Sequence, residues 1–411
     1  MFVVLPVCSF LRGKPETFCR SDYRWKPCLT GAIVVARFGR RLPKVELTRA
    51  CGLKATSDVP SSPPALGTDD LELRACDESH QLDRLPVAGL PGILRAPLVL
   101  LKFSRPHTLL GSVVSICSLC LMGGFSAVPA AALSTLSFWS RLLVVCAVGI
   151  VPSMLMNIYI VGLNQLYDIP VDRVNKPYLP LASGELSVPV AALIVTACFL
   201  GSLGLGFWLP QSTTALRVSL IVSGLLGTLY SMPPVRLKRY PFLASLCILV
   251  VRGAVVNLGF YLHARTALAT SNGLFAVGFS PLIRFATAFF AVYGIVIALM
   301  KDIPDLEGDI EYRLDSFSNR YGQRNVFNLC VGLLIATFVA GGFACVSPWL
   351  ITRPPYKAVA ASTVHFIAAA WLLQRSRYAR AHVHSREAVY SFYMDVWKCF
   401  YLEYLTLPLL L

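Results

Sequence analysis

Nine apolar segments, separated by shorter polar stretches, follow one another from residue 106 to the end of the chain. Each is about 20 residues long, the length that an α-helix needs to cross the hydrocarbon core of a bilayer. The pattern therefore predicts an all-α integral membrane protein with about nine transmembrane helices. We expect these helices over 106–127, 142–167, 187–209, 215–232, 241–262, 284–301, 325–347, 356–374 and 390–410.

Residues 1–94 lack this pattern and are rich in Arg, Lys, Ser and Pro. The first 50 residues carry ten Lys or Arg and three Asp or Glu. A basic, acid-poor leader of this kind is typical of an organelle transit peptide. We therefore expect residues 1–94 to be a transit peptide and a flexible lead-in, and residues 95–411 to be the membrane domain.

The composition agrees with a chain that has lipid as its solvent, because 55% of its residues are hydrophobic and 14% are charged. The formal charge of +15 comes from Lys and Arg scattered at the ends of apolar segments and in the leader, without a long basic tract. This distribution predicts a bilayer as partner and no nucleic acid, and no segment indicates an obligate protein partner. The 13 cysteines are an odd number and indicate no disulfide framework. Basic residues concentrate after the even-numbered segments, which places those loops on one side of the membrane.

Asn164, Asp168 and Asp172 form a first acidic cluster at the end of the second apolar segment. Carboxylates at the mouth of an intramembrane helix are costly and are therefore candidates for function. Asn164 and Asp168 are four residues apart and share a helix face. Because a proline disfavours helix at the residue before it, we expect Pro170 to unwind the helix before Asp172.

Asp302, Asp305 and Asp309 form a second acidic cluster at the end of the sixth apolar segment. Their spacing predicts one helix face, although Pro304 disturbs the turn. The two clusters are separated by four helices, so both lie on the same side of the membrane, and we expect them to face each other across a central cavity. Oxygen ligands with open positions suit Mg²⁺ that is shared with a phosphate. The alternative is that these carboxylates are only solvated helix ends.

A basic loop, Arg236, Lys238 and Arg239, follows the fourth apolar segment. Arg and Lys suit phosphate oxygens, so Arg236 and Lys238 are candidates for binding an anionic substrate, although membrane topology alone could explain them. Further candidate substrate-binding residues lie at the same membrane level: Arg105, Arg173, Lys176, Tyr230 and Lys301.

Arg252 differs from these residues because it lies well inside the fifth apolar segment. A charge at that depth needs a partner. Two alternatives stay open, a substrate carboxylate and a structural carboxylate of the protein. Under the first, His263 or Asn257 further along the same helix could assist Arg252 in orienting the substrate.

The pattern N-x-x-x-D-x-x-x-D followed by a second D-x-x-x-D resembles the UbiA-type intramembrane prenyltransferases, and more closely their homogentisate prenyltransferase branch. The resemblance spans roughly residues 100 to 411. The generic Y-x-x-x-K pattern is not kept, because Pro234 stands where Lys would be. Contact with the diphosphate is therefore expected from Arg236 or Lys238. The segments that carry the resemblance are NQLYDIPVDRVNKPYLPLASGELS, LGTLYSMPPVRLKRYP, KDIPDLEGD and WKCFYLEYLTLPLL.

This resemblance implies a UbiA-type fold of nine helices around a cavity that opens to lipid. It implies that the first acidic cluster binds one Mg²⁺ and that Asp305 and Asp309 bind a second with the assistance of Asp302, the five aspartates being the catalytic residues. The implied reaction transfers a polyprenyl group from its diphosphate to homogentisate with loss of CO₂, in a plastid (chloroplast) membrane.

The donor remains open among phytyl, geranylgeranyl and solanesyl diphosphate. The segments MNIYIVGLNQ and LPLASGE resemble the phytyl enzymes more than the solanesyl ones. Phytyl transfer would place the enzyme in tocopherol (vitamin E) biosynthesis, whereas solanesyl transfer would belong to plastoquinone biosynthesis. A rival class is a cation transporter that uses the acidic clusters as ion sites. A transporter should carry its carboxylates near the middle of the bilayer, within an inverted repeat.

Overall fold

The computed structural model describes residues 92–269, 279–347 and 355–411. Within these residues every regular element is helical. We predicted a transit peptide and lead-in over residues 1–94. Residues 1–91 of that range lie outside the described residues. The first described element is the short helix α3 (Gly92–Phe103).

Within the described residues the nine predicted helices are confirmed, and they are continuous over most of the expected ranges. They are α4 (Pro106–Phe125), α5 (Leu136–Asn175), α7 (Val188–Trp208), α8 (Thr214–Ser231), the run of α9 (Pro241–Leu249), η3 (Val250–Val255) and α10 (Val256–Leu268), α11 (Pro281–Asp302), α14 (Gln323–Cys345), α15 (Pro355–Ala381) and α16 (Arg386–Thr406). Shorter elements connect or follow them: η1 (Ala130–Ser134), α6 (Pro180–Ser183), η2 (Leu237–Arg239), α12 (Leu306–Glu311), α13 (Phe317–Tyr321) and η4 (Leu407–Leu410).

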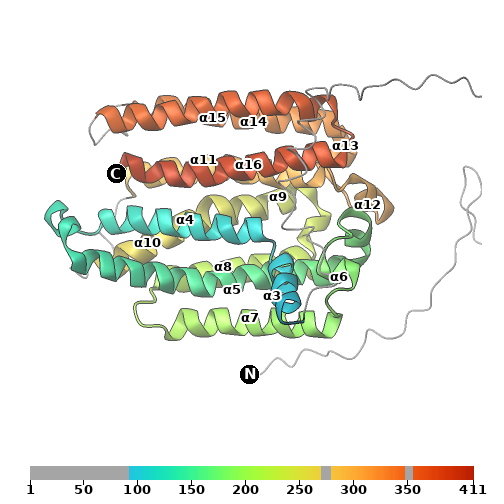
Figure 1. The fold of residues 1–411 in the computed structure, drawn as a ribbon, viewed down its shortest axis with the longest axis horizontal. Helices are drawn as coiled ribbons and strands as arrows, with labels where there is room; N and C mark the ends of the chain where they lie inside the picture. The colour runs from blue at the N-terminus through green and yellow to red at the C-terminus, as the bar shows by residue number, and fades with distance from the viewer. Residues whose placement is uncertain (1–91, 270–278, 348–354) are drawn as a thin grey trace, which may run out of the picture. The chain divides into compact units, whose positions relative to one another are not determined.

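Eight of these spans are long and apolar enough to cross a membrane, within the part of the chain that the structure describes. The ninth, α16, is more polar, since it carries Asp395, Lys398 and Glu403. It nevertheless packs against α4, α11 and α15 and buries Trp397 and Phe400 almost completely. Figure 1 shows α16 beside α11, between the α14–α15 pair and α4. The carboxylates of Asp395 and Glu403 are buried in the bundle, where Asp395 pairs with Arg375 of α15, whereas Lys398 is exposed.

Small residues set how closely the helices approach. A Cβ at Gly123 in α4 would overlap the backbone carbonyl oxygen of Tyr261 in α10. At Gly162 in α5, a Cβ would lie 2.6 Å from the Phe103 ring and 2.7 Å from a methyl group of Val195 in α7. Close backbone approach of this kind is how helices pack in lipid, where no hydrophobic force drives them together.

Helix α5 runs for 40 residues without a break, so the prediction that Pro170 unwinds it was wrong. Proline removes one backbone hydrogen bond, and in a packed membrane helix this loss is tolerated where neighbouring groups compensate. Forty residues of helix span about 60 Å, well beyond the hydrocarbon core of a bilayer. Asn164, Asp168 and Asp172 consequently occupy successive turns of one helix face near the end of α5.

The second acidic cluster is arranged differently from the prediction of a single helix face. Asp302 is the last residue of α11, Asp305 precedes α12, and Asp309 lies inside α12. The interruption falls at Pro304, which cannot continue a helix without loss of a hydrogen bond. The chain therefore turns between Asp302 and Asp305, and α12 returns toward the end of α5, which it contacts. In Figure 1, α6, α12 and α13 gather at this one end of the bundle.

Candidate active site

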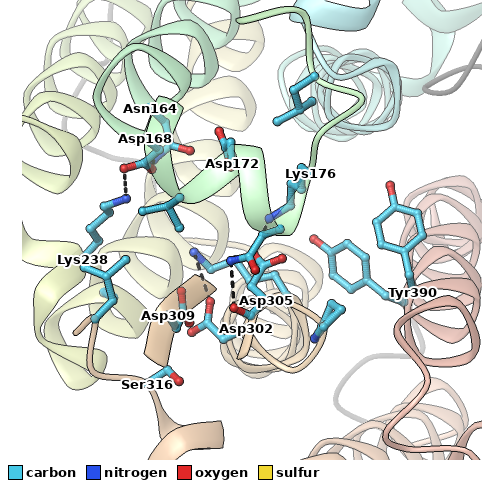
Figure 2. Close-up of a pocket in the computed structure, with 18 of the residues that line it drawn as sticks. Asn164, Asp168, Asp172, Lys176, Lys238, Asp302, Asp305, Asp309, Ser316 and Tyr390 are labelled. Carbon is cyan, nitrogen blue, oxygen red and sulfur yellow. Dashed lines mark hydrogen bonds and ion pairs between the residues drawn. The ribbon is translucent and has the colours of Figure 1, made fainter. Parts of the chain in front are cut away.

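The ends of α5 and α11, with the loop after α8, enclose a cavity of about 130 Å³, here called the acidic cavity. Both acidic clusters line it, although they are far apart in the sequence. Figure 2 shows Asn164, Asp168 and Asp172 on one side and Asp302, Asp305 and Asp309 on the other. The charged residues that line the cavity are Arg105, Asp168, Asp172, Lys176, Lys238, Lys301, Asp302, Asp305, Asp309 and Asp315, with His107 beside them.

Asp168 connects the first acidic cluster to the basic loop. Its carboxylate accepts a hydrogen bond from Asn164 Nδ2 at 2.7 Å, which confirms that these two side chains share a face. The same carboxylate pairs with Arg236 Nη2 at 2.9 Å and with the Lys238 ammonium. Arg236 has a left-handed backbone, with φ of 39°, which is uncommon and costly for a residue other than glycine. The loop is thus held in a strained conformation that directs two cations at one buried carboxylate.

The second acidic cluster is neutralised from other directions. Asp305 pairs with the Lys176 ammonium, and Asp302 lies 3.7 Å from Lys301 Nζ. Lys301 also donates to the hydroxyl of Tyr230. Burial lowers the pKa of Lys176, but the carboxylates of Asp305 and Asp172 outweigh it and raise that pKa above its ordinary value. Lys176 therefore keeps its charge in the cavity.

Asn175 fastens the two acidic segments together. Its amide donates to the backbone carbonyl of Asp305 at 2.8 Å and accepts from the backbone N–H of Gly308 at 2.9 Å. A Cβ at Gly308 would lie 2.7 Å from the Asn175 amide, so only glycine fits this position without movement. This contact fixes α12 against the end of α5 and thereby fixes the distance between the clusters.

Two buried carboxylates, Asp172 and Asp309, form no ion pair in the described part of the chain. Burial raises the pKa of Asp309 to about 7, and the neighbouring Asp302 and Asp305 add to the effect. A carboxylate that is desolvated and repelled by like charges in this way is stabilised by a bound cation. Asp172 and Asp309 are therefore two points in the cavity where a bound cation would be stabilising.

The charges around the cavity are nevertheless balanced overall. Six carboxylates line it with four Lys or Arg side chains, and Arg236 and Arg320 pair with Asp168 and Asp315 from just outside the lining. A diphosphate would add several negative charges to this balanced set. Additional cations must accompany it, since an uncompensated buried charge is very costly.

The side chains present fit Mg²⁺ by their chemistry. Carboxylate and amide oxygens are the ligands that Mg²⁺ prefers, and both acidic clusters supply them to one cavity. As the side chains stand, no three His, Cys, Asp or Glu among the described residues are grouped closely enough to hold an ion. Lysine and arginine groups occupy the positions next to Asp168 and Asp305 instead.

A second cavity, of about 270 Å³, continues from the acidic cavity into the bundle and is here called the inner cavity. Its exposed surface is mainly apolar, although nine Ser, Thr and Asn side chains also line it. Five residues line both cavities: Arg105, Asn164, Tyr230, Lys301 and Tyr393. An amphiphile with an anionic head and an apolar tail could therefore occupy both cavities at once.

The structure places most of the predicted site residues at the acidic cavity, but not all of them. Arg236 is not part of the lining and acts through its contact with Asp168. Arg173 is exposed and lines neither cavity. Arg252 lines the inner cavity, with no carboxylate partner among the described residues. Sequence reasoning missed Asn175 and Tyr393, because their roles depend on contacts between distant segments.

Comparison with known proteins decides the family. Residues 116–394 match the model of the UbiA prenyltransferase family. The chain belongs to this family. It is 44% identical over 313 residues to homogentisate phytyltransferase 1, chloroplastic, of Arabidopsis thaliana, covering 75% of this chain and 74% of the relative. It is 35% identical over 316 residues to homogentisate solanesyltransferase, chloroplastic, of the same plant, covering 75% of each.

Among solved structures, a UbiA homologue from Archaeoglobus fulgidus bound to GPP and Mg²⁺ is similar at 16% identity and a TM-score of 0.49, over 75% of this chain and 99% of that one. The family match confirms the resemblance seen in the sequence. The acidic clusters lie at helix ends among cations, which differs from the mid-bilayer ion sites expected of a transporter.

Proposed function

We propose that this protein transfers a phytyl group from phytyl diphosphate to homogentisate in a plastid membrane. The observation that carries the proposal is the pair of connected cavities, one charged and one largely apolar, that share Arg105, Tyr230 and Lys301. Phytyl is favoured over solanesyl because the Arabidopsis phytyltransferase is 44% identical to this chain and the solanesyltransferase 35%. The chloroplastic names of both relatives support the location.

The donor would lie with its diphosphate in the acidic cavity and its chain in the inner cavity. Arg105, Lys176, Lys238 and Lys301 surround the space available to the diphosphate oxygens. Four fixed cations stabilise negative charge as it develops on the departing diphosphate, without having to reorganise at the moment of reaction. Tyr230, held by Lys301, lies where the two cavities meet and would contact the allylic end of the chain.

Asn164, Asp168 and Asp172 are the residues that would hold one Mg²⁺, and Asp302, Asp305 and Asp309 those that would hold a second. When bound, Mg²⁺ neutralises the diphosphate and supplies electrostatic stabilisation of the leaving group. Arg236 and Lys238 keep the Asp168 carboxylate oriented toward the cavity, and Asn175 holds α12 at its distance from α5. These contacts keep the two ligand sets on opposite sides of one diphosphate site.

The transfer breaks the bond between the allylic carbon and the diphosphate oxygen and forms a bond from that carbon to the aromatic ring. Diphosphate leaves with the electron pair of the broken bond. The ring carbon that is alkylated gives up its proton, the acetate side chain loses its carboxylate as CO₂, and a proton takes the place of that carboxylate on the remaining methylene carbon. The products are a methyl-prenyl-benzoquinol, CO₂ and diphosphate. The mainly apolar surface of the inner cavity would disfavour water next to the reacting carbon.

The test is an assay of membranes that contain the protein, supplied with Mg²⁺, ring-labelled homogentisate and one of three donors, phytyl, geranylgeranyl or solanesyl diphosphate. The lipid product is identified by its mass. We expect the methyl-phytyl-benzoquinol to form fastest, and membranes that contain Asp305→Asn to form little of it. Absence of any prenylated product would refute the proposal, and fastest use of solanesyl diphosphate would replace the donor with the solanesyl alternative.

A further inference from the structure

Arg252 is a charged residue deep in the bundle that the donor site does not use. It lies in the middle of the membrane span Pro241–Leu268. A charge at this depth is costly unless a cavity or an anion compensates it. Within the described residues its guanidinium forms no salt bridge and no side-chain hydrogen bond, and it lines the inner cavity but not the acidic one.

The backbone at Arg252 is specially arranged and firmly held. η3 is a π-helical turn, a feature that often occurs at functional sites. The buried amide of Asn257 donates to the carbonyls of Arg252 at 2.7 Å and Gly253 at 2.9 Å, and the Tyr404 hydroxyl donates to Asn257 Oδ1 at 3.0 Å. A Cβ at Gly253 would lie 2.8 Å from the Cα of Ala291 in α11. The turn is therefore fixed from two sides.

Asn257 and His263, the two residues expected to assist Arg252, have other roles. Asn257 supports its backbone from behind and does not line the cavity. His263 lies elsewhere, with Nδ1 2.9 Å from the Thr213 hydroxyl and Nε2 3.2 Å from the carbonyl oxygen of Val145. Both ring nitrogens of His263 are therefore engaged in structural contacts, and the expectation that it assists Arg252 in orienting a substrate was wrong.

Aromatic rings flank the guanidinium. Its central carbon lies 5.3 Å from the centre of the Trp397 ring and 5.6 Å from that of Phe400. Cation–π contacts of this kind orient a guanidinium and leave its N–H edge available, because the rings take up its faces. Trp397 itself lines the inner cavity. The site thus offers a planar, five-donor cation whose orientation is set by two buried aromatic rings.

A polar patch lines the same cavity on another helix. Asn157 of α5 lines the inner cavity, and its Nδ2 donates to the Thr108 hydroxyl at 3.1 Å, which directs the amide. Its carbonyl oxygen is then the remaining acceptor for a ligand hydroxyl. Ser153 lies one turn earlier and also lines the cavity. A small aromatic acid with ring hydroxyls matches this set of groups.

We propose that Arg252 binds the carboxylate of the aromatic acceptor, with a ring hydroxyl of the acceptor on Asn157. The inference rests on the proposed function for the identity of the acceptor as homogentisate. The diphosphate of the donor is excluded as the partner of Arg252, because it has its own cations in the acidic cavity. A carboxylate matches the fork of a guanidinium with two parallel hydrogen bonds.

The test compares Arg252→Gln with Arg265→Gln. Arg265 lies on α10, rests against the Tyr261 ring and lines neither cavity, so it is a matched control for the loss of an arginine beside an aromatic ring. The purified protein is assayed for the Michaelis constants of homogentisate and phytyl diphosphate. In a second measurement, labelled homogentisate is bound directly and displaced with methylhydroquinone, which carries a methyl group in place of the acetate.

We expect Arg252→Gln to raise the homogentisate constant about 10- to 100-fold, as the loss of a charge-assisted hydrogen bond does. The constant for phytyl diphosphate and the affinity for methylhydroquinone should stay within about twofold of wild type, which also shows that the variant is folded. Arg252→Lys should restore part of the affinity, and Arg265→Gln should bind homogentisate as wild type does.

Two results would overturn the assignment. One is an unchanged homogentisate constant in Arg252→Gln, and the other is a joint shift of the donor constant and the Mg²⁺ dependence, which would make Arg252 a structural residue. Failure of the proposed function is a different outcome, because the wild-type protein would then neither bind homogentisate nor prenylate it.

Discussion

Replacing Asp168 by asparagine separates the role of its charge from the role of its shape. Asparagine keeps the volume and can still contact Asn164, but it removes the charge that faces Arg236 and Lys238. Removing one partner of a fully buried ion pair costs about 3–5 kcal/mol. Both cations here keep some access to water, so we expect a smaller loss of folding stability, roughly 1–3 kcal/mol.

The chain offers a matched control at Asp395 in α16. Asp395 is also buried and also has two cationic partners, Arg375 Nε at 2.7 Å and Lys398 Nζ at 2.8 Å. It lines neither the acidic nor the inner cavity. Asp395→Asn therefore leaves two cations without their carboxylate, as Asp168→Asn does, but at a position outside the proposed site.

The predicted difference lies in turnover per folded molecule. We expect Asp168→Asn to lose at least about 10²-fold in kcat, equivalent to about 2.7 kcal/mol, the usual effect of removing one main charge-stabilising group. Asp395→Asn should retain kcat within about threefold while its melting temperature falls. Both variants are purified, the folded fraction is measured by size-exclusion chromatography, and the initial rate is normalised to that fraction. Equal losses of kcat in the two variants would refute the reasoning, since the effect would then come from folding alone.

Three further predictions concern the donor site and the packing. Asp305→Asn, which breaks the pair with Lys176, should lower kcat at least about 10²-fold at normal protein levels, with the rate normalised to folded protein. Wild-type turnover in this variant would mean that the carboxylate is only a solvated helix end. Lys238→Ala should raise the Michaelis constant for phytyl diphosphate far more than that for homogentisate. Arg239 in the same loop is exposed, so Arg239→Ala should leave both constants unchanged. Equal effects of the two variants would indicate a role in membrane topology. Gly123→Val should lower the free energy of unfolding by about 1–3 kcal/mol in a thermal scan, because its side chain meets the backbone of α10; unchanged melting would contradict the packing.

The helices were predictable because their signal is local. A run of about 20 apolar residues has few alternatives to a membrane helix, and in the part of the chain that the structure describes each of the nine predicted runs is helical. The pairing of Asn164 with Asp168 followed from helix periodicity in the same way. The unwinding expected at Pro170 did not occur, since propensity is a weak predictor inside a packed bundle.

Features that depend on distant segments could not be predicted in the same way. The contact between Asn175 and Gly308 joins residues 133 positions apart, and no local pattern distinguishes them from loop residues. The turn between Asp302 and Asp305 replaced the expected single helix face. For Arg252, the sequence indicated that a partner was needed, but only the fold shows that the described protein supplies rings and no carboxylate.

If the charge-balanced cavity accepts a diphosphate only together with divalent cations, turnover must depend on Mg²⁺. Purified protein is supplied with homogentisate and phytyl diphosphate, first with excess chelator and then with Mg²⁺ restored above the chelator. We expect no methyl-phytyl-benzoquinol in chelator and full recovery with Mg²⁺, because the acidic clusters and the diphosphate repel each other without the ion. Full turnover in excess chelator would contradict it.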